Sequence, residues 1–245
     1  MFAFQDSRGS VDVAFTDRHG GTSGGPFASL NLSDGTGDST VDVRRNLDTV
    51  ADAFARDPAR RRLVLMQQVH GADVHVVDGA ETDHTDQEPV ADALVTALPD
   101  VVLVVRVADC VPVLLADAEA GVLGAAHAGR AGLAAGVLSN TVREMRALGA
   151  TEITGWLGPH VCGACYEVPE QLRADVASAA PESFAHTRSG TPSLDLGAGV
   201  TAQLRRAGVE VVDASRCTME DDDLYSHRRQ GARSGRLAGL VTRRS

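Results

Sequence analysis

The chain has 245 residues, of which 43% are hydrophobic and 23% are charged, and its formal net charge at pH 7 is −10. No stretch approaches the roughly 18 apolar residues that span a bilayer. Nucleic-acid-binding proteins usually carry a clustered basic face, whereas the net charge of this chain is negative. We therefore expect neither a membrane nor a nucleic-acid partner. The opening residues, MFAFQDSRGS, lack the apolar core of a secretory signal, which predicts a cytoplasmic protein. Because we find no fixed repeat or long linker, we expect one domain over residues 1–245.

The N-terminal part is predicted to contain strands, one long loop and one helix. Residues 11–18 alternate like a strand and lead into a glycine-rich loop, HGGTSGGPFASLNLSDGTGD, at 19–38. Apolar residues at helical intervals predict a helix over 41–55, after a serine-threonine pair that can cap its start. Residues 62–78 predict two strands around a turn at His70-Gly71. Further strands are predicted at 92–97 and 101–108, and an exposed loop at 78–89.

The segment VADCVPVLLADAEAGVLGAAHAG, residues 107–129, predicts an antiparallel hairpin. Its apolar runs at 111–115 and 122–126 flank a six-residue connection, ADAEAG. If Leu115 pairs with Val122, the same register places Cys110 opposite His127. Their Cβ atoms would then lie about 4.5 to 5.5 Å apart.

The C-terminal part alternates helices and strands. Helices are predicted at 133–149, 170–179 and 194–208, and strands at 152–159 and 209–215. Hairpins combined with helix–strand alternation favour an α/β (α+β) fold, in which mixed β-sheets are layered with helices in a single domain.

A cysteine that faces a histidine supports two kinds of chemistry. Thiolate and imidazole are zinc ligands, and the same pair can also act as a nucleophile with its general base. A catalytic zinc site needs a third protein ligand, and His70, at a junction between strand and turn, is the best candidate. Cys162 and Cys165 form a Cys-x-x-Cys pair, but a zinc ribbon needs a second such pair and the sequence has none. We therefore interpret this pair as part of a turn.

Other common catalytic signatures are missing from the sequence. It contains no Walker A loop, no G-x-S-x-G elbow and no H-x-E motif of the zinc deaminases. Arg106 lies four residues before Cys110 and is expected on the same strand face. An arginine among valines is costly unless it is paired, so Arg106 meets either a buried carboxylate or an anionic group of a substrate.

Several segments, in this order along the chain, resemble the YfiH-like laccase-domain family, also called the multicopper polyphenol oxidase or peptidoglycan-editing-factor family. The segments are RHGGTSGGPFASLNL, QQVHGADV, ADALVT, RVADCVPVLLAD, GAAHAGRAGL and SHRRQGARSGRLAGL, and they cover about residues 14–241. The resemblance implies a layered fold of mixed sheets and helices. It also implies a metal, zinc or else copper, held by His70, Cys110 and His127.

The same resemblance implies a purine nucleoside phosphorylase that acts on adenosine, inosine, guanosine and S-methyl-5′-thioadenosine, with adenosine deaminase activity as well. Its partners would be a nucleoside and phosphate, and Cys110 would belong to the catalytic centre. Asp109 would assist proton transfer or orient a ligand. The remaining candidates are Arg18, Arg106 and Arg228 for phosphate, and Gln68 and Asn31 for base or ribose.

This chain departs from the family at one motif. It has His127-Ala128-Gly129-Arg130-Ala131-Gly132 where the family has H-A-G-W-R-G, so the tryptophan is lost and the arginine is shifted by one position. Three alternative functions stay open. They are copper-dependent oxidation of phenols, hydrolysis of a peptidoglycan precursor by a metal-free Cys110 with His127 as base, and a non-catalytic partner protein with a structural zinc.

Overall fold

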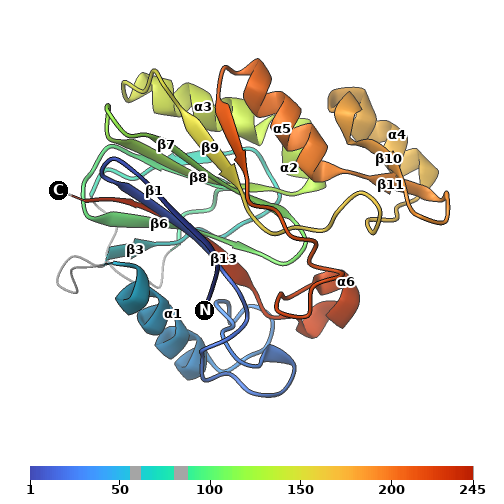
Figure 1. Ribbon diagram of the computed structural model, residues 1–245, viewed down its shortest axis with the longest axis horizontal. Helices are drawn as coiled ribbons and strands as arrows, with labels where there is room; N and C mark the ends of the chain where they lie inside the picture. The colour runs from blue at the N-terminus through green and yellow to red at the C-terminus, as the bar shows by residue number, and fades with distance from the viewer. Residues whose placement is uncertain (56–61, 80–87, 245) are drawn as a thin grey trace.

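A computed structural model describes residues 1–55, 62–79 and 88–244, and within them two β-sheets stack face to face with helices on both outer sides (Figure 1). The first sheet has the order β1 (Phe2–Arg8), β2 (Val11–Thr16), β13 (Leu237–Arg243), β6 (Val101–Val107) and β3 (Arg62–Val64). The second has the order β12 (Glu210–Asp213), β9 (Thr154–Leu157), β7 (Val111–Asp117), β8 (Val122–Ala128), β5 (Ala93–Thr96) and β4 (Val74–Val76).

Helices cover the outer faces of both sheets. The helices are α1 (Thr40–Phe54), α2 (Arg130–Ala135), α3 (Val137–Ala147), α4 (Glu170–Ala179), α5 (Leu196–Arg206) and the short α6 (His227–Gln230). Helix α1 lies under the first sheet, and α2, α3 and α5 lie over the second (Figure 1). A small hairpin, β10 (Phe184–His186) with β11 (Pro192–Leu194), lies beside α4. This arrangement confirms the predicted mixed α/β fold.

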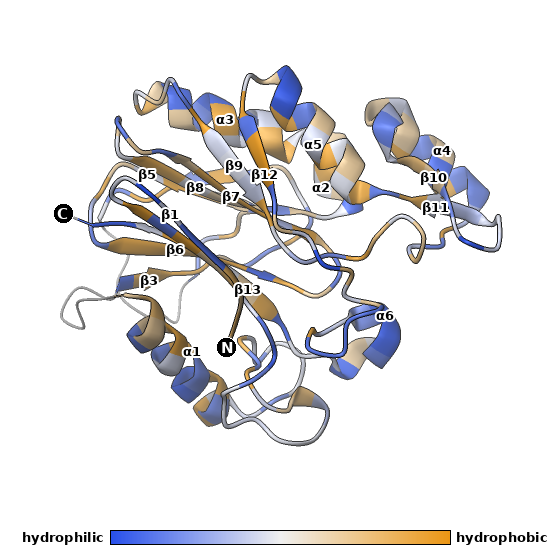
Figure 2. Ribbon diagram, viewed as in Figure 1, coloured by the Kyte–Doolittle hydropathy of each residue, from blue (hydrophilic) through white to orange (hydrophobic). Residues whose placement is uncertain are grey.

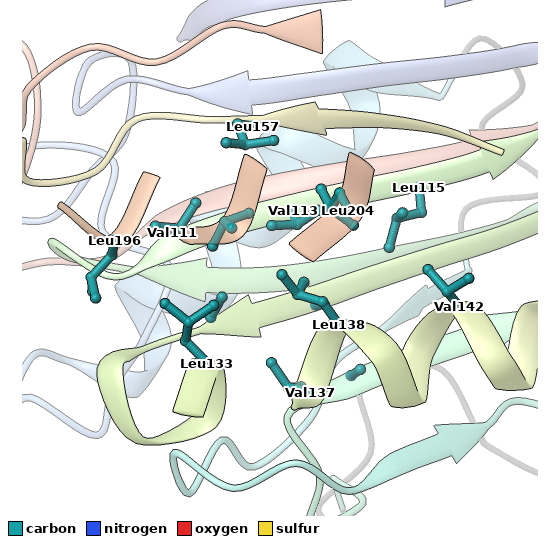
Figure 3. Packing of buried hydrophobic residues seen from close by; sticks show 14 of the residues in the cluster. Val111, Val113, Leu115, Leu133, Val137, Leu138, Val142, Leu157, Leu196 and Leu204 are labelled. Atoms are coloured by element: carbon teal, nitrogen blue, oxygen red, sulfur yellow. The ribbon is translucent and has the colours of Figure 1, made fainter. Parts of the chain in front are cut away.

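Strand β7 shows why both sheets are so apolar. Successive side chains of a strand point to opposite faces, and every residue of β7 is buried. Val113 and Leu115 pack with Leu138 and Leu204 of the covering helices (Figure 3). Leu114 points the other way, into the core between the two sheets. The inner strands are accordingly mostly hydrophobic, whereas the helices also carry hydrophilic residues (Figure 2).

Two helix predictions agree closely with the structure. Helix α1 begins after Ser39, whose hydroxyl accepts a hydrogen bond from the Asp42 backbone N–H at 3.3 Å, and α4 spans the predicted residues 170–179. The single helix predicted over 133–149 is wrong. Gly136 adopts a left-handed φ of 85° and separates α2 from α3, because a helix cannot continue through that conformation.

The hairpin of β7 and β8 forms, but in a different register. Asp117 pairs with Val122 and Pro112 with His127, so the connection has four residues, 118–121, rather than six. The predicted pairing of Cys110 directly opposite His127 is therefore wrong. The register differs by two residues on one strand, and a shift of two keeps side chains on the same face. Cys110 thus lies diagonally across from His127 and on the same side.

Two other expectations for the strands are corrected. The two strands predicted around the turn at His70-Gly71 are present as β3 and β4, shorter than expected, and they belong to different sheets. The terminal strands β1 and β13 were not predicted, although β13 lies between β2 and β6. Of the loop expected at 78–89, residues 80–87 lie outside the described residues. Among the residues that the structure covers, no helix is long and apolar enough to cross a membrane.

Asp117 anchors the end of this hairpin. Its buried carboxylate accepts hydrogen bonds from four backbone N–H groups, those of Glu119, Ala120, Thr151 and Glu152, at 2.7 to 3.1 Å. Burial raises the pKa of the carboxyl, but the four donors outweigh burial and hold the pKa below its ordinary value.

We expect Asp117→Asn to lower the free energy of unfolding by about 2 to 3 kcal/mol, because the amide nitrogen cannot accept these bonds. Urea denaturation measures the change, with the exposed Asp34→Asn as a control. The carboxylate stabilises the wild type fully above its unfolded pKa near 4 and loses this effect as the pH falls through the lower folded pKa. Equal stability of the two variants at pH 7 would contradict this role.

Candidate metal centre

His70, Cys110 and His127 converge from three different segments. His70 lies between β3 and β4, Cys110 directly precedes β7, and His127 lies near the end of β8. One ligand atom from each residue lies within 4.8 Å of the others. The Cys110 Sγ is 3.7 Å from the His70 Nε2, and the two imidazole rings meet edge to face with centroids 4.7 Å apart.

Two residues at this centre, His70 and Asp109, have unusual backbone conformations. His70 has a φ of 61° and Asp109, directly before Cys110, has a φ of 84°. Residues other than glycine rarely adopt positive φ, and such strain gathers at functional sites. The sharp bend at Asp109 separates β6 from β7. Cys110 therefore lies beyond β6, and the prediction that Arg106 and Cys110 share one strand face is wrong.

Asp92, directly before β5, contacts both His127 and the turn that contains His70. It is completely buried, and its carboxylate accepts a hydrogen bond from the Nδ1 of His127 at 2.8 Å. It also accepts the backbone N–H groups of Val69, His70 and Gly71, at 3.2, 2.9 and 2.6 Å. One carboxylate thus orients the His127 ring, leaves its Nε2 free to face Cys110, and holds the turn that carries His70.

Sequence reasoning did not assign Asp92 a role. The signal was an acidic residue at the second position of the largely apolar run ADALVT, where an unpaired charge would be costly. Its partners lie more than twenty residues away on both sides, so spacing alone could not reveal them.

Gly129 provides room for the side chains of His70 and Cys110. A Cβ atom there would lie 2.7 Å from the His70 Cδ2 and 3.2 Å from the Cys110 Sγ. Its backbone φ of −77° is open to any residue, so space is what requires glycine. Gly129 therefore lets the segment between β8 and α2 pass directly beside His70 and Cys110.

We expect Gly129→Ala to weaken metal binding at this centre by about tenfold or more, since even outer-shell changes around a metal cost about 10- to 100-fold. Competition with a chromophoric chelator measures the affinity. Gly24→Ala is the control, because a Cβ there meets nothing within 4 Å. An affinity equal to that of the control would show that the donors do not need this space.

Contacts within the centre shift the pKa values of Cys110 and His127. Burial raises the pKa of the Cys110 thiol, but contacts with His127 and His70 outweigh burial and lower it to about 6. Burial lowers the pKa of His127, but Asp92 and Cys110 raise it to about 9. Cys110 is therefore a thiolate at neutral pH, which is the form that binds a metal.

The three side chains fit a zinc or copper ion. One thiolate and two imidazoles suit both metals, and three protein ligands leave a position open, as in catalytic zinc sites. Asp92 holds the Nδ1–H of His127, so the Nε2 is the ring nitrogen that would bind a metal, and it loses its proton on binding. The donor chemistry and the space above Gly129 both agree with a metal ion between the three residues.

A large cavity opens over these residues. Its volume is about 1150 Å³, and the residues of the centre form part of its wall. Five arginines also line it: Arg44, Arg106, Arg130, Arg228 and Arg236. A cavity of this size can hold an organic ligand, and its guanidinium groups suit an anion.

Two of these arginines contact Tyr166 in the cavity wall. The Arg228 guanidinium lies 4.3 Å above the Tyr166 ring, and the Arg130 Nη1 is 3.5 Å from the Tyr166 hydroxyl. Asp109 accepts hydrogen bonds from the Arg228 backbone N–H at 2.7 Å and from the Thr218 hydroxyl at 2.6 Å. The carboxylate of Asp109 therefore connects Thr218 and the start of α6 to the backbone directly before Cys110.

The remaining predicted contacts differ in their surroundings. Gln68 lines the cavity, but both ends of its amide bond the Arg106 backbone, at 2.7 and 2.9 Å. The Arg106 side chain pairs with Glu88 and donates to the Met66 carbonyl at 2.9 Å. Arg106 thus pairs with a carboxylate, as expected for an arginine among apolar neighbours, and it also lines the cavity.

The structure does not bring Arg18 and Asn31 to this cavity. Arg18 donates to the Ala28 carbonyl at 2.9 Å and stacks on the Tyr225 ring. Asn31 is completely buried, and its amide bonds Ser33, Asp38 and the Arg236 backbone N–H. Both residues instead hold the glycine-rich loop at 19–38 in an ordered shape.

The fold and the site together define a class: a mixed α/β protein whose open site of two histidines and one cysteine lies in an arginine-lined cavity. The family model described as multi-copper polyphenol oxidoreductase laccase matches residues 12–244. The chain belongs to this family, which confirms the resemblance noted in the sequence.

Individual relatives agree with this assignment. A purine nucleoside phosphorylase of Streptomyces griseus is 51% identical over 237 residues, which cover 95% of this chain and 94% of that protein. The crystal structure of YfiH from Bacillus licheniformis superposes with a TM-score of 0.87 at 28% identity and covers 96% of this chain and 93% of that one. YlmD from Geobacillus stearothermophilus superposes with a TM-score of 0.85 at 30% identity, over 100% and 99%.

The copper in the family's description is not matched by several copper sites here. Over residues 1–55, 62–79 and 88–244, only two groups of three or more metal-ligating side chains occur. One is the centre described above, and the other consists of three cysteines and a glutamate. A single group that contains histidine gives little support to multicopper oxidation of phenols.

Proposed function

We propose that the protein is a zinc-dependent purine nucleoside phosphorylase that also deaminates adenosine. The observation that carries the proposal is the position of the His70, Cys110 and His127 donors in the wall of a cavity lined by five arginines. Phosphorolysis needs an anion site next to a nucleoside site, and the arginines and the volume of this cavity, about 1150 Å³, support that requirement. The name of the Streptomyces griseus relative supports the same activity.

In the proposed reaction, an oxygen of phosphate forms a bond to C1′ of the ribose while the bond from C1′ to N9 of the purine breaks. The electron pair of that bond leaves with the purine, which takes up a proton, and the other product is ribose 1-phosphate, or 5-methylthioribose 1-phosphate when the substrate is S-methyl-5′-thioadenosine. Adenosine, inosine, guanosine and S-methyl-5′-thioadenosine all contain this bond. Deamination of adenosine instead adds water at C6 of the base and releases ammonia, giving inosine.

The chain's own residues position these reactants. His70, Cys110 and His127 would hold the metal, which would supply Lewis-acid chemistry and lower the pKa of water. Arg228 and Arg130 are the best candidates to bind phosphate, because both line the cavity and contact Tyr166, and the backbone N–H of Arg228 bonds Asp109, next to Cys110. Asp109 acts as a positioning residue, since its carboxylate oxygens already bond Thr218 and Arg228.

We expect Arg228→Gln to raise the KM for phosphate by roughly tenfold and to leave the KM for adenosine nearly unchanged, because a charge-assisted contact is lost. Steady-state kinetics with each substrate varied in turn measure the split. Arg205→Gln, a change on the exposed side of α5, is the matched control. An equal rise in both constants would indicate a damaged cavity rather than a lost phosphate contact.

The function itself is tested by incubating metal-analysed protein with adenosine, with and without phosphate. We expect adenine and ribose 1-phosphate only when phosphate is present, and inosine in both cases. Absence of turnover by zinc-loaded protein, or formation of adenine without phosphate, would contradict the proposal.

A second candidate function is favoured by the thiolate character of Cys110 beside His127. Without a metal, this pair could act as nucleophile and general base in the hydrolysis of a peptidoglycan precursor. The two functions respond differently to reagents. Hydrolysis of a peptidoglycan precursor that survives chelation but is abolished by thiol alkylation supports the hydrolase. Phosphorolysis of adenosine that chelation removes and zinc restores supports the phosphorylase.

A further inference from the structure

A second group of cysteines lies outside the cavity wall, in two short turns that face each other. One turn, Cys162-Gly163-Ala164-Cys165, follows β9, and the other, Cys217-Thr218-Met219-Glu220, follows β12. In each turn the backbone carbonyl of the first cysteine accepts the N–H of the residue three positions on, at 3.0 and 3.1 Å. The two turns therefore have the same spacing and the same internal hydrogen bond.

The four donor atoms of these turns converge on one point. A ligand atom from each of Cys162, Cys165, Cys217 and Glu220 lies within 4.8 Å of the others. The Cys165 Sγ is 3.5 Å from the Glu220 Oε1, and the Cys162 backbone N–H donates to the Cys217 Sγ at 3.4 Å. Sulfur atoms around a tetrahedral zinc lie about 3.8 Å apart, as Zn–S bonds of about 2.3 Å require. The donors need only small movements to reach that geometry.

We propose that Cys162, Cys165, Cys217 and Glu220 bind a structural zinc ion that clamps these two loops together. The chemistry favours zinc over magnesium or calcium, because thiolates are soft ligands. Four protein ligands close the coordination sphere, which is typical of a structural site and distinguishes it from the open three-ligand centre in the cavity. The partner of the Cys-x-x-Cys pair is thus Cys-x-x-Glu, and no second Cys-x-x-Cys pair is needed.

The charge around the four donors fits a bound cation. Zinc binding would deprotonate the three thiols, and the three thiolates and one carboxylate would then carry four negative charges, of which the divalent ion neutralises two. Arg188, from the turn between β10 and β11, pairs with Glu220, and its Nη1 lies 3.8 Å from the Cys165 Sγ. This guanidinium reduces the remaining negative charge and orients the carboxylate, as outer-shell partners of metal ligands do.

Residues next to the four donors of the clamp contact residues of the cavity wall. Tyr166, which follows Cys165, lies in the cavity wall beneath Arg228. Thr218, which follows Cys217, donates its hydroxyl to Asp109 beside Cys110. Each loop therefore carries one contact of the cavity next to one pair of donors. A zinc ion between the loops would fix the distance between these two contacts.

The test compares the zinc content of purified full-length variants by mass spectrometry of the metal. We expect Cys165→Ser to hold one zinc ion per chain fewer than the wild type. Cys110→Ser, which affects the other centre, should retain the zinc of the clamp. After substitution with Co²⁺, the Cys110→Ser protein should show the strong visible bands of tetrahedral cobalt with thiolate ligands, and Cys165→Ser/Cys110→Ser should not.

A milder variant keeps the test decisive if a cysteine change disturbs folding. Glu220→Gln should raise the dissociation constant for zinc at the clamp by about tenfold or more, since even outer-shell changes cost about 10- to 100-fold. Glu182→Gln is the matched control, because Glu182 pairs with Arg206 on the surface as Glu220 pairs with Arg188. Unchanged zinc content in Cys165→Ser, or a disulfide between Cys162 and Cys165 in the protein as purified, would overturn the proposal.

Discussion

Cys110→Ala is expected to lower kcat/KM for phosphorolysis of adenosine by roughly 10²- to 10³-fold, because a catalytic metal contributes several kcal/mol to the transition state. The thiolate is the strongest donor of the three, and the two imidazoles alone hold zinc weakly. Metal analysis of the same preparation should show the loss of this zinc ion. Activity and metal content should therefore fall together.

The control for this prediction is His75→Ala, which removes a half-buried histidine from β4, outside the cavity lining. Its zinc content and its activity should match those of the wild type. A Cys110→Ala protein that retains full activity would contradict the role of the centre. A protein that loses activity but keeps its metal at the centre would instead point to Cys110 as a nucleophile.

Asp92→Asn is expected to damage both the fold and the centre. The buried carboxylate accepts four hydrogen bonds, and an asparagine would direct its NH₂ group at one or two of the same donors. We expect a loss of about 3 to 5 kcal/mol in the free energy of unfolding, as for other broken buried ion pairs. Zinc affinity at the centre should fall by about 10- to 100-fold, because His127 loses its orienting partner.

Urea denaturation and chelator competition measure these two effects separately. Asp73→Asn is the matched control, an exposed aspartate on the segment between His70 and β4. The pH dependence adds a further check. Burial raises the pKa of Asp92, but His127 and the backbone donors outweigh burial and lower it, so its stabilisation is lost only as the pH falls below about 4. Wild-type stability of Asp92→Asn at pH 7 would contradict the role of this carboxylate.

The layered fold and the donors of the centre were largely predictable from local patterns. Period-two and helical spacing gave most strands and helices, and the apolar runs of 107–129 gave a hairpin with Cys110 and His127 on one face. The register was wrong by two residues because both strands are apolar on both faces, so their side chains do not fix the alignment. The face was right because a two-residue shift preserves it.

The features that were missed depend on contacts between distant segments. Asp92 binds His127 thirty-five residues later and the turn at His70 twenty-two residues earlier, and no local spacing encodes either distance. The partner of Cys162 and Cys165 lies about fifty-five residues further on and includes a glutamate, which a search for paired cysteines overlooks. Arg18 and Asn31 were chosen by their residue types, but the fold uses them to hold a loop.

The most direct test of the account is an anomalous-scattering measurement on crystals of the protein, above and below the zinc absorption edge. We predict a peak between the His70 Nε2, the Cys110 Sγ and the His127 Nε2, about 2.0 to 2.3 Å from each atom. Crystals of protein shown to phosphorolyse adenosine should contain this peak. Active crystals with no anomalous density among these three residues would contradict the account.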